Sequence, residues 1–221
     1  MKVALLAAIC TVAWVNGQTL FPQVQRGPML ETLASLKVSF ERCAMNPEQR
    51  ESALHCLKNI EYFETAANKW KPRRPTDGQG MRISLQKMLG VVQNMKPGSA
   101  EAVRTLNDLA DDLSDKRSVC WRAGLDAQPM VEVRPKKNGM IDAPGLEVWY
   151  LEKFLASDPT AKPHRFPGFS SPVTDELVPG RYLFWSAEPG GRNGVGTKTE
   201  QRVASQGNKL AVPIRIEVLA P

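Results

Sequence analysis

The chain has 221 residues, with 29 lysines and arginines against 23 aspartates and glutamates and a formal net charge of +6. The basic residues are spread along the whole chain, whereas a nucleic-acid-binding protein concentrates them on one face or in one domain, so nucleic acid is excluded as the expected partner. The length is sufficient for two small domains with cores of their own.

The N-terminus has the order of residues that is typical of a secretory signal. Lys2 is followed by an apolar stretch, Val3–Val15, and then by small residues up to Gly17. We therefore predict a signal peptide over residues 1–17 and a secreted or periplasmic mature protein. Lipid attachment at Cys10 is disfavoured because this residue lies inside the apolar stretch. That stretch spans only about 20 Å as a helix, less than a bilayer core, and no later segment is long and apolar enough, so we expect no transmembrane anchor after cleavage.

The next part of the chain predicts helices. Residues 18–28 hold two prolines and a glycine without periodicity, which indicates an extended leader. Within residues 29–125, apolar residues recur at three- and four-residue spacings, typical of amphipathic helices. The four segments lie near 30–40, 53–67, 83–92 and 103–113. Asn46-Pro47 and Ser99 have the features of helix starts, and the short connections predict an up-and-down array of about four helices.

The pattern changes to that of strands in residues 129–221. Asn138-Gly139 is a strong hairpin-turn signal. Short runs rich in branched and aromatic residues are separated by glycine and proline. These runs are Met130–Val133, Leu146–Leu151, Arg181–Trp185, Thr197–Val203 and Leu210–Leu219. We predict an all-β sandwich and, for the whole chain, an α+β fold.

Two stretches of this region carry a resemblance to a known family. Gly145–Tyr150 is a glycine followed by an apolar strand, and Leu177–Tyr182 reads Leu-Val-Pro-Gly-Arg-Tyr before the next strand. With the closing alternating strand, this order resembles carboxypeptidase regulatory-like or transthyretin-like β-sandwich domains. An acidic-Gly pair common in such domains is replaced by Phe169–Pro172. The resemblance implies a non-catalytic accessory module of envelope or secreted proteins.

Trp149 and Trp185 are the candidate ligand-binding residues. Because side chains alternate between the two faces of a strand, both faces of these two strands are apolar. One face fills the sandwich core. The second face has to be covered by the helical region, which is the simplest interpretation, or by an envelope protein or a glycan that stacks on the indoles.

Charged clusters offer weaker candidates. A basic cluster, comprising Lys69, Lys71, Arg73 and Arg74, surrounds Trp70 and is a candidate anion-binding site, with a solvated linker as the alternative. Four aspartates (Asp108, Asp111, Asp112 and Asp115) share one helical face, which we expect to be exposed. One side of a helix is a poor calcium site, so no metal is predicted.

Three cysteines remain after signal cleavage: Cys43, Cys56 and Cys120. An odd number allows at most one internal disulfide and leaves one thiol over. In a helical hairpin Cys43 and Cys56 would be offset by about 10 Å along the axis, beyond the roughly 7 Å limit between disulfide Cα atoms, so Cys120 is the alternative partner. A zinc site is disfavoured because the chain has no Cys-x-x-Cys and only two histidines. We expect no cofactor.

These patterns favour an exported, non-catalytic binding or structural protein of the cell envelope. No set of residues in the sequence converges on a catalytic arrangement. Two alternatives remain open. One is a secreted hydrolase that uses His164 with Ser170 or Ser171. The other is an assembly subunit that is joined through the leftover thiol.

Overall fold

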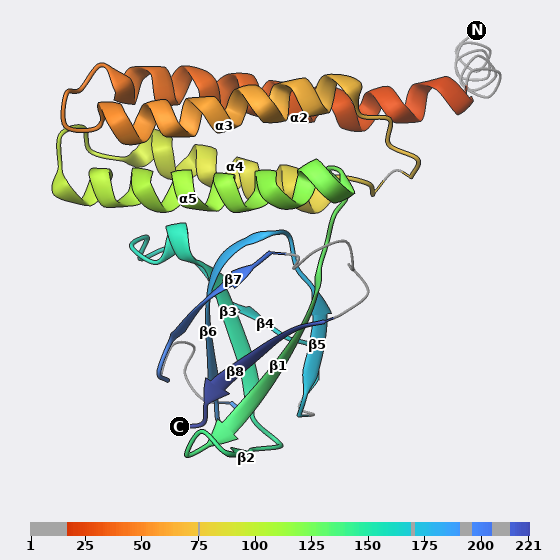
Figure 1. Ribbon diagram of the computed structural model, residues 1–221, viewed down its shortest axis with the longest axis vertical. Coiled ribbons are helices and arrows are strands. Elements are labelled where there is room, and N and C mark those ends of the chain that lie inside the picture. The colour runs from red at the N-terminus through yellow and green to blue at the C-terminus, as the bar shows by residue number, and fades with distance from the viewer. Residues whose placement is uncertain (1–16, 75, 169–170, 191–195, 205–212) are drawn as a thin grey trace, which may run out of the picture.

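The computed structural model describes residues 17–74, 76–168, 171–190, 196–204 and 213–221, with side chains from residue 26 onward (Figure 1). The predicted signal peptide therefore lies outside the described residues, except for Gly17. Within the described part of the chain, no helix is long and apolar enough to cross a membrane.

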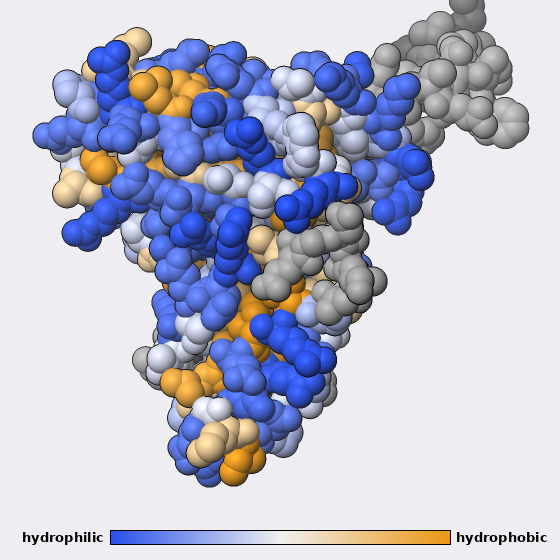
Figure 2. All heavy atoms as spheres, in the orientation of Figure 1, coloured by the Kyte–Doolittle hydropathy of each residue, from blue (hydrophilic) through white to orange (hydrophobic). Residues whose placement is uncertain are grey.

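Four helices form the N-terminal half of the described chain, as predicted. They are α2 (Gly17–Ala44), α3 (Arg50–Lys69), α4 (Gln79–Asn94) and α5 (Ala100–Ala123). Helix α2 packs against α3 and α4, and α3 packs against α5. Figure 1 shows two layers, with α4 and α5 next to the sandwich. The face of the array seen in Figure 2 is mostly hydrophilic, because the amphipathic helices turn their apolar sides inward.

The predicted extended leader is wrong, because residues 18–28 belong to α2. Proline removes a hydrogen bond from a helix, which is why the leader was predicted as non-helical. However, Met29, directly after Pro28, is already buried in the core, and Arg26 Nη1 donates a hydrogen bond to the Asn68 carbonyl of α3. Tertiary packing of this kind outweighs intrinsic helix propensity.

The two predicted helix starts have different outcomes. Ser99 caps α5, and its hydroxyl accepts a hydrogen bond from the Ala102 backbone N–H at 3.1 Å. Helix α3, in contrast, begins at Arg50 rather than at Pro47. The Asn46 side chain accepts from the Glu48 backbone N–H at 3.0 Å, which makes a separate turn before the helix.

The C-terminal half is a sandwich of two four-stranded sheets, which confirms the predicted α+β class. In the first sheet, β1 (Met130–Lys137) pairs antiparallel with β2 (Ile141–Asp142) and β5 (Val173–Glu176) and parallel with β8 (Ile214–Leu219). The second sheet is antiparallel throughout, in the order β4 (His164–Arg165), β3 (Glu147–Glu152), β6 (Gly180–Ala187) and β7 (Thr199–Val203). A short 3₁₀ helix, η1 (Lys153–Leu155), follows β3.

The hairpin turn between β1 and β2 has the predicted geometry. Asn138 and Gly139 have φ values of 53° and 71°, as the two central residues of a type I′ turn require. The Met140 backbone N–H donates to the Lys137 carbonyl at 3.2 Å and closes the turn.

The alternation along β3 and β6 separates two hydrophobic cores. Val148, Tyr182 and Phe184 lie in the core between the two sheets. The opposite side chains, Leu151 and Trp185, belong to a cluster that also contains the apolar residues of all four helices. The second apolar face of this sheet is therefore covered by the helical array. Burial of this continuous apolar surface joins the two halves of the molecule.

Candidate functional site at the junction of helices and sandwich

The four aspartates of α5 face the sandwich, not the solvent. Asp112 and Asp115 are only 1% and 3% exposed. Their spacing correctly predicted that they share one face of the helix. It could not show that strands β6 and β7, much later in the chain, present arginines to this face. The expected exposed acidic surface is thus one half of an interface, in which Asp112 and Asp115 are buried and Asp108 and Asp111 are partly buried.

A buried ion pair lies at the centre of this interface. Lys116 Nζ contacts Asp112 Oδ2, and Lys116 is 0% exposed. The other oxygen of Asp112 accepts a hydrogen bond from the Arg181 backbone N–H at 2.7 Å. Burial raises the pKa of Asp112, although the Lys116 ammonium favours the charged carboxylate.

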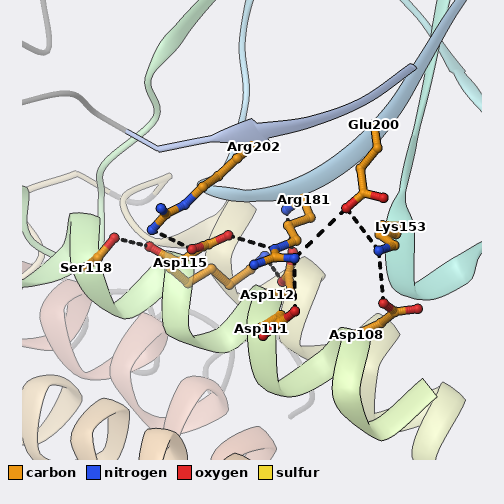
Figure 3. A network of polar contacts seen from close by, with 10 residues as sticks. Asp108, Asp111, Asp112, Asp115, Ser118, Lys153, Arg181, Glu200 and Arg202 are labelled. Atoms are coloured by element: carbon orange, nitrogen blue, oxygen red, sulfur yellow. Dashed lines mark hydrogen bonds and ion pairs between the residues drawn. The ribbon is translucent and has the colours of Figure 1, made fainter. Parts of the chain in front are cut away.

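Further ion pairs extend from this centre along α5 (Figure 3). Arg181 contacts Asp115 through Nε at 3.1 Å and Asp111 through Nη1 at 2.9 Å. Arg202 Nη2 lies 2.6 Å from Asp115 Oδ1. At the far end, Lys153 bridges Asp108 at 3.2 Å and Glu200 at 2.9 Å. The charges of the helix and of the strands compensate one another, so this network acts as a joint between the two halves.

Gly180 allows the close approach of β6 to α5. A Cβ atom at this position would lie 2.5 Å from Asp112 Oδ1 and 2.7 Å from Lys116 Nζ. Only a residue without a side chain leaves room for the buried pair. The close packing against α5 therefore explains why a glycine stands at this position of the Leu-Val-Pro-Gly-Arg-Tyr stretch.

A second polar cluster joins α4 to the sandwich. Lys87 Nζ lies 2.7 Å from Glu152 Oε1 and 3.2 Å from His164 Nε2. The His164 ring stacks on Tyr150, with 5.3 Å between ring centroids. Ser171 Oγ is buried without a hydrogen-bond partner among the described residues. No described contact joins it to His164, and Ser170 lies outside the described residues.

The two tryptophans proposed as ligand-binding residues are directly opposite each other on β3 and β6. Trp185 is 0% exposed, and Lys198 Nζ lies 5.2 Å from its ring centroid. Trp149 is half-buried and packs against the helical core. Neither indole N–H has a partner among the described residues. Trp185 thus has no ring face open to a ligand in the structure.

The basic cluster lies in an ordered connection between α3 and α4. Asp77 accepts hydrogen bonds from the backbone N–H groups of Arg73 and Arg74 at 2.8 and 2.9 Å, and from Arg74 Nε at 2.8 Å. Burial alone would raise the pKa of Asp77, but these donors outweigh it and lower the pKa. Arg74 is committed to this turn. Lys69, Lys71 and Arg73 are exposed and have no ion-pair partner among the described residues.

Cys43, Cys56 and Cys120 are free thiols in the structure, so the one internal disulfide that the sequence allowed does not join any of these described cysteines. Cys43 is half-buried, while Cys56 and Cys120 are buried. Burial raises the pKa of the Cys120 thiol to about 12 and also raises that of Cys56. The thiolate is the reactive form, so these buried groups are chemically inert at neutral pH.

A groove lies beside the joint, between the helices and the sandwich. Its walls are the last turn of α4, the turn into α5, the first turns of α5, and Ser157–Thr160 after η1. Its volume is about 400 Å³, which falls within the usual range for small-molecule sites. It continues past Asn94 and Thr160 toward Lys87, Lys162 and His164. Sequence reasoning identified Ser99 as a helix cap but missed the groove, because Ser157–Thr160 has no periodicity that pairs it with α5.

Comparisons of the chain with models of known families, with curated proteins and with solved structures give no match.

Proposed function

We propose that this protein is an exported, non-catalytic binding protein of the cell envelope or the extracellular space. In this proposal the C-terminal half is an accessory module of the carboxypeptidase regulatory-like type, and the helical array is built onto one of its sheets. The partner is an envelope protein or a glycan.

The observation that carries the proposal is the way the two halves are joined. The helices and the second sheet share one apolar core, and the charged residues of the joint pair with one another. Such an arrangement fixes the position of the helical array relative to the sandwich. It also uses the acidic and basic groups between them for structural ion pairs. Hollows between the halves stay open to the outside, and the groove beside the start of α5 has a volume that suits recognition of a ligand.

Export is tested by expressing the full chain in a bacterium with a periplasm and determining the N-terminus of the recovered protein by mass spectrometry. We expect a mature chain that begins at Gln18. Leu6→Arg interrupts the apolar stretch of the signal and should leave uncleaved protein in the cytoplasm. Retention of Met1 on protein of the original sequence that has reached the periplasm would contradict the predicted cleavage.

The non-catalytic role is tested separately on the mature protein. We expect saturable binding to isolated envelope material and no labelling by a fluorophosphonate probe. The control is Ser171→Ala, which removes one of the two serines proposed for a hydrolase. Labelling that disappears in this variant would replace the binding proposal with hydrolysis.

A further inference from the structure

We propose that the outer face of the helical array, where α3 and α5 pack together, is a docking site for an acidic segment of a partner protein. Its anchor is Trp121, with Tyr62 and Arg117 beside it. This inference rests on the proposed function as a binding protein and names the chemistry of the partner. The site lies near the end of α5, whereas the groove lies beside the start of that helix.

The first feature that supports this site is an exposed aromatic cluster. Trp121 is 75% exposed, and its ring centroid lies 6.1 Å from that of Tyr62 on α3. The Arg117 guanidinium lies over the Tyr62 ring, 5.1 Å from its centroid. Tryptophan, tyrosine and arginine are the residues that most often dominate the binding energy of protein interfaces. A surface group of all three therefore favours a protein as the partner.

The second feature is the positive charge around these rings. Lys58 and Lys69 are four residues before and seven residues after Tyr62, spacings that place them on the same side of α3. Both lysines are exposed. Within the described part of the chain, no carboxylate forms an ion pair with either lysine or with Arg117. These cations attract an acidic segment and repel a basic one.

The carboxylates in this part of the array leave the positive charge uncompensated. Glu61 lies about 100° further round α3 than the tyrosine that follows it. Glu64 forms an ion pair with Lys37 of α2. Asp126, after the end of α5, accepts a hydrogen bond from Trp70 Nε1 at 3.2 Å. The aspartates of α5 face the sandwich, so they lie on another side of that helix.

The third feature is the fixed position of the rings. Helices α3 and α5 lie side by side (Figure 1), and the hydrogen bond from Trp70 to Asp126 joins the end of α3 to the chain that follows α5. A rigid surface loses little conformational entropy when a partner binds. The exposed neighbours of the rings, Thr65 and Ser118, are polar. This face therefore lacks the broad apolar side that a helix needs to enter a lipid surface.

The test is an NMR titration of the isotope-labelled mature protein with two synthetic peptides. One carries a phenylalanine among glutamates, and the other has lysines in place of the glutamates. We expect the acidic peptide to cause saturable shifts of the Trp121 indole N–H and the Arg117 amide, and the basic peptide to cause none. Trp121→Ala should weaken binding about tenfold and Arg117→Met about fivefold. Lys69→Met should weaken it about threefold.

The matched control is Met140→Ala, because Met140 is a large side chain that is 79% exposed in the β1–β2 turn, in the other half of the molecule. It should leave the affinity unchanged. No saturable shift with the acidic peptide, equal binding of the basic peptide, or an equal effect of Met140→Ala would overturn the docking site. If a variant at Trp121 or Arg117 does not fold, Lys69→Met decides the matter, since Lys69 is exposed.

A second measurement separates a protein partner from a lipid surface. It is sedimentation of the protein with vesicles of phosphatidylcholine and phosphatidylglycerol in equal parts. We expect no association that depends on Trp121, and Trp121-dependent association as strong as peptide binding would overturn the protein partner. Envelope binding that Trp121→Ala leaves unchanged would overturn this inference and leave the proposed function standing. Peptide binding by a protein that binds no envelope material would do the reverse.

Discussion

At the scale of single residues, the buried pair of Lys116 and Asp112 carries a large cost in desolvation free energy. Both side chains are removed from water, which costs several kcal/mol per ion before their attraction is counted. The pair is tolerated because Arg181 N–H supplies a further hydrogen bond to Asp112. Each partner therefore depends on the other for its place in the core.

Lys116→Met should destabilise the protein by about 3–5 kcal/mol, because it leaves the Asp112 carboxylate buried without a cation. The double variant Asp112→Asn/Lys116→Met should recover much of this loss, since asparagine still accepts from Arg181 N–H and carries no charge. Urea unfolding of the two variants measures the difference. Equal destabilisation of both would show that the loss comes from packing rather than from charge.

At the scale of elements, the connection between α3 and α4 depends on one carboxylate. Asp77 binds two backbone N–H groups and the Arg74 guanidinium, and its pKa is lowered from the ordinary value of 3.8. A lowered pKa means that the folded state favours the ionised form. This contribution to stability is present above pH 3.8 and is lost as the pH falls through the lowered pKa of the folded protein.

Asp77→Asn should therefore destabilise the protein at pH 6 by about 1–3 kcal/mol, since an amide is a weaker acceptor for these donors. The difference from the original protein should be smaller at pH 2.5 than at pH 6, because this contribution to stability decreases once the pH falls below 3.8 toward the lowered pKa of Asp77. Free energies of unfolding at the two pH values provide the measurement. A difference that is constant with pH would show that the ionised form plays no special part.

Much of the arrangement of elements could be predicted from local pattern. The four amphipathic helices, the Ser99 cap and the Asn138-Gly139 turn depend on nearby residues, and these predictions were confirmed. The leader was predicted incorrectly because its helix is stabilised by packing on α3 and α4, which no local rule includes. The groove was missed for the same reason, since Thr105 and Ser157 come together only in the folded chain.

At the scale of the whole molecule, the contact between the helical array and the sandwich turns surface residues of a typical sandwich into core residues. Trp185 is the clearest case, because it is fully buried in the cluster that contains the helices. From the sequence, Trp185 was a candidate ligand-binding residue, with cover by the helical region as the simpler interpretation. Its position in the structure gives it a large share in holding the two halves together.

Trp185→Ala should cost about 3–5 kcal/mol of stability, as expected for a buried aromatic residue. Trp121→Ala is the matched control, because Trp121 is 75% exposed and its truncation should cost no more than about 1 kcal/mol. Thermal unfolding of both variants checks the contrast. Similar small losses for the two would contradict the buried role of Trp185.

The parallel pairing of β1 with β8 has a consequence for how the chain folds. Val131 lies opposite Ile214, so the central strand of the first sheet gains this neighbour only from the last described strand. Contacts between such distant parts of a chain form slowly, because a long loop must lose conformational entropy before these contacts can stabilise the sheet. The helices, built from local contacts, can form early, while the sandwich stays open until its last strand is in place. For a chain that is exported as we propose, the final form would be reached only after that strand has arrived.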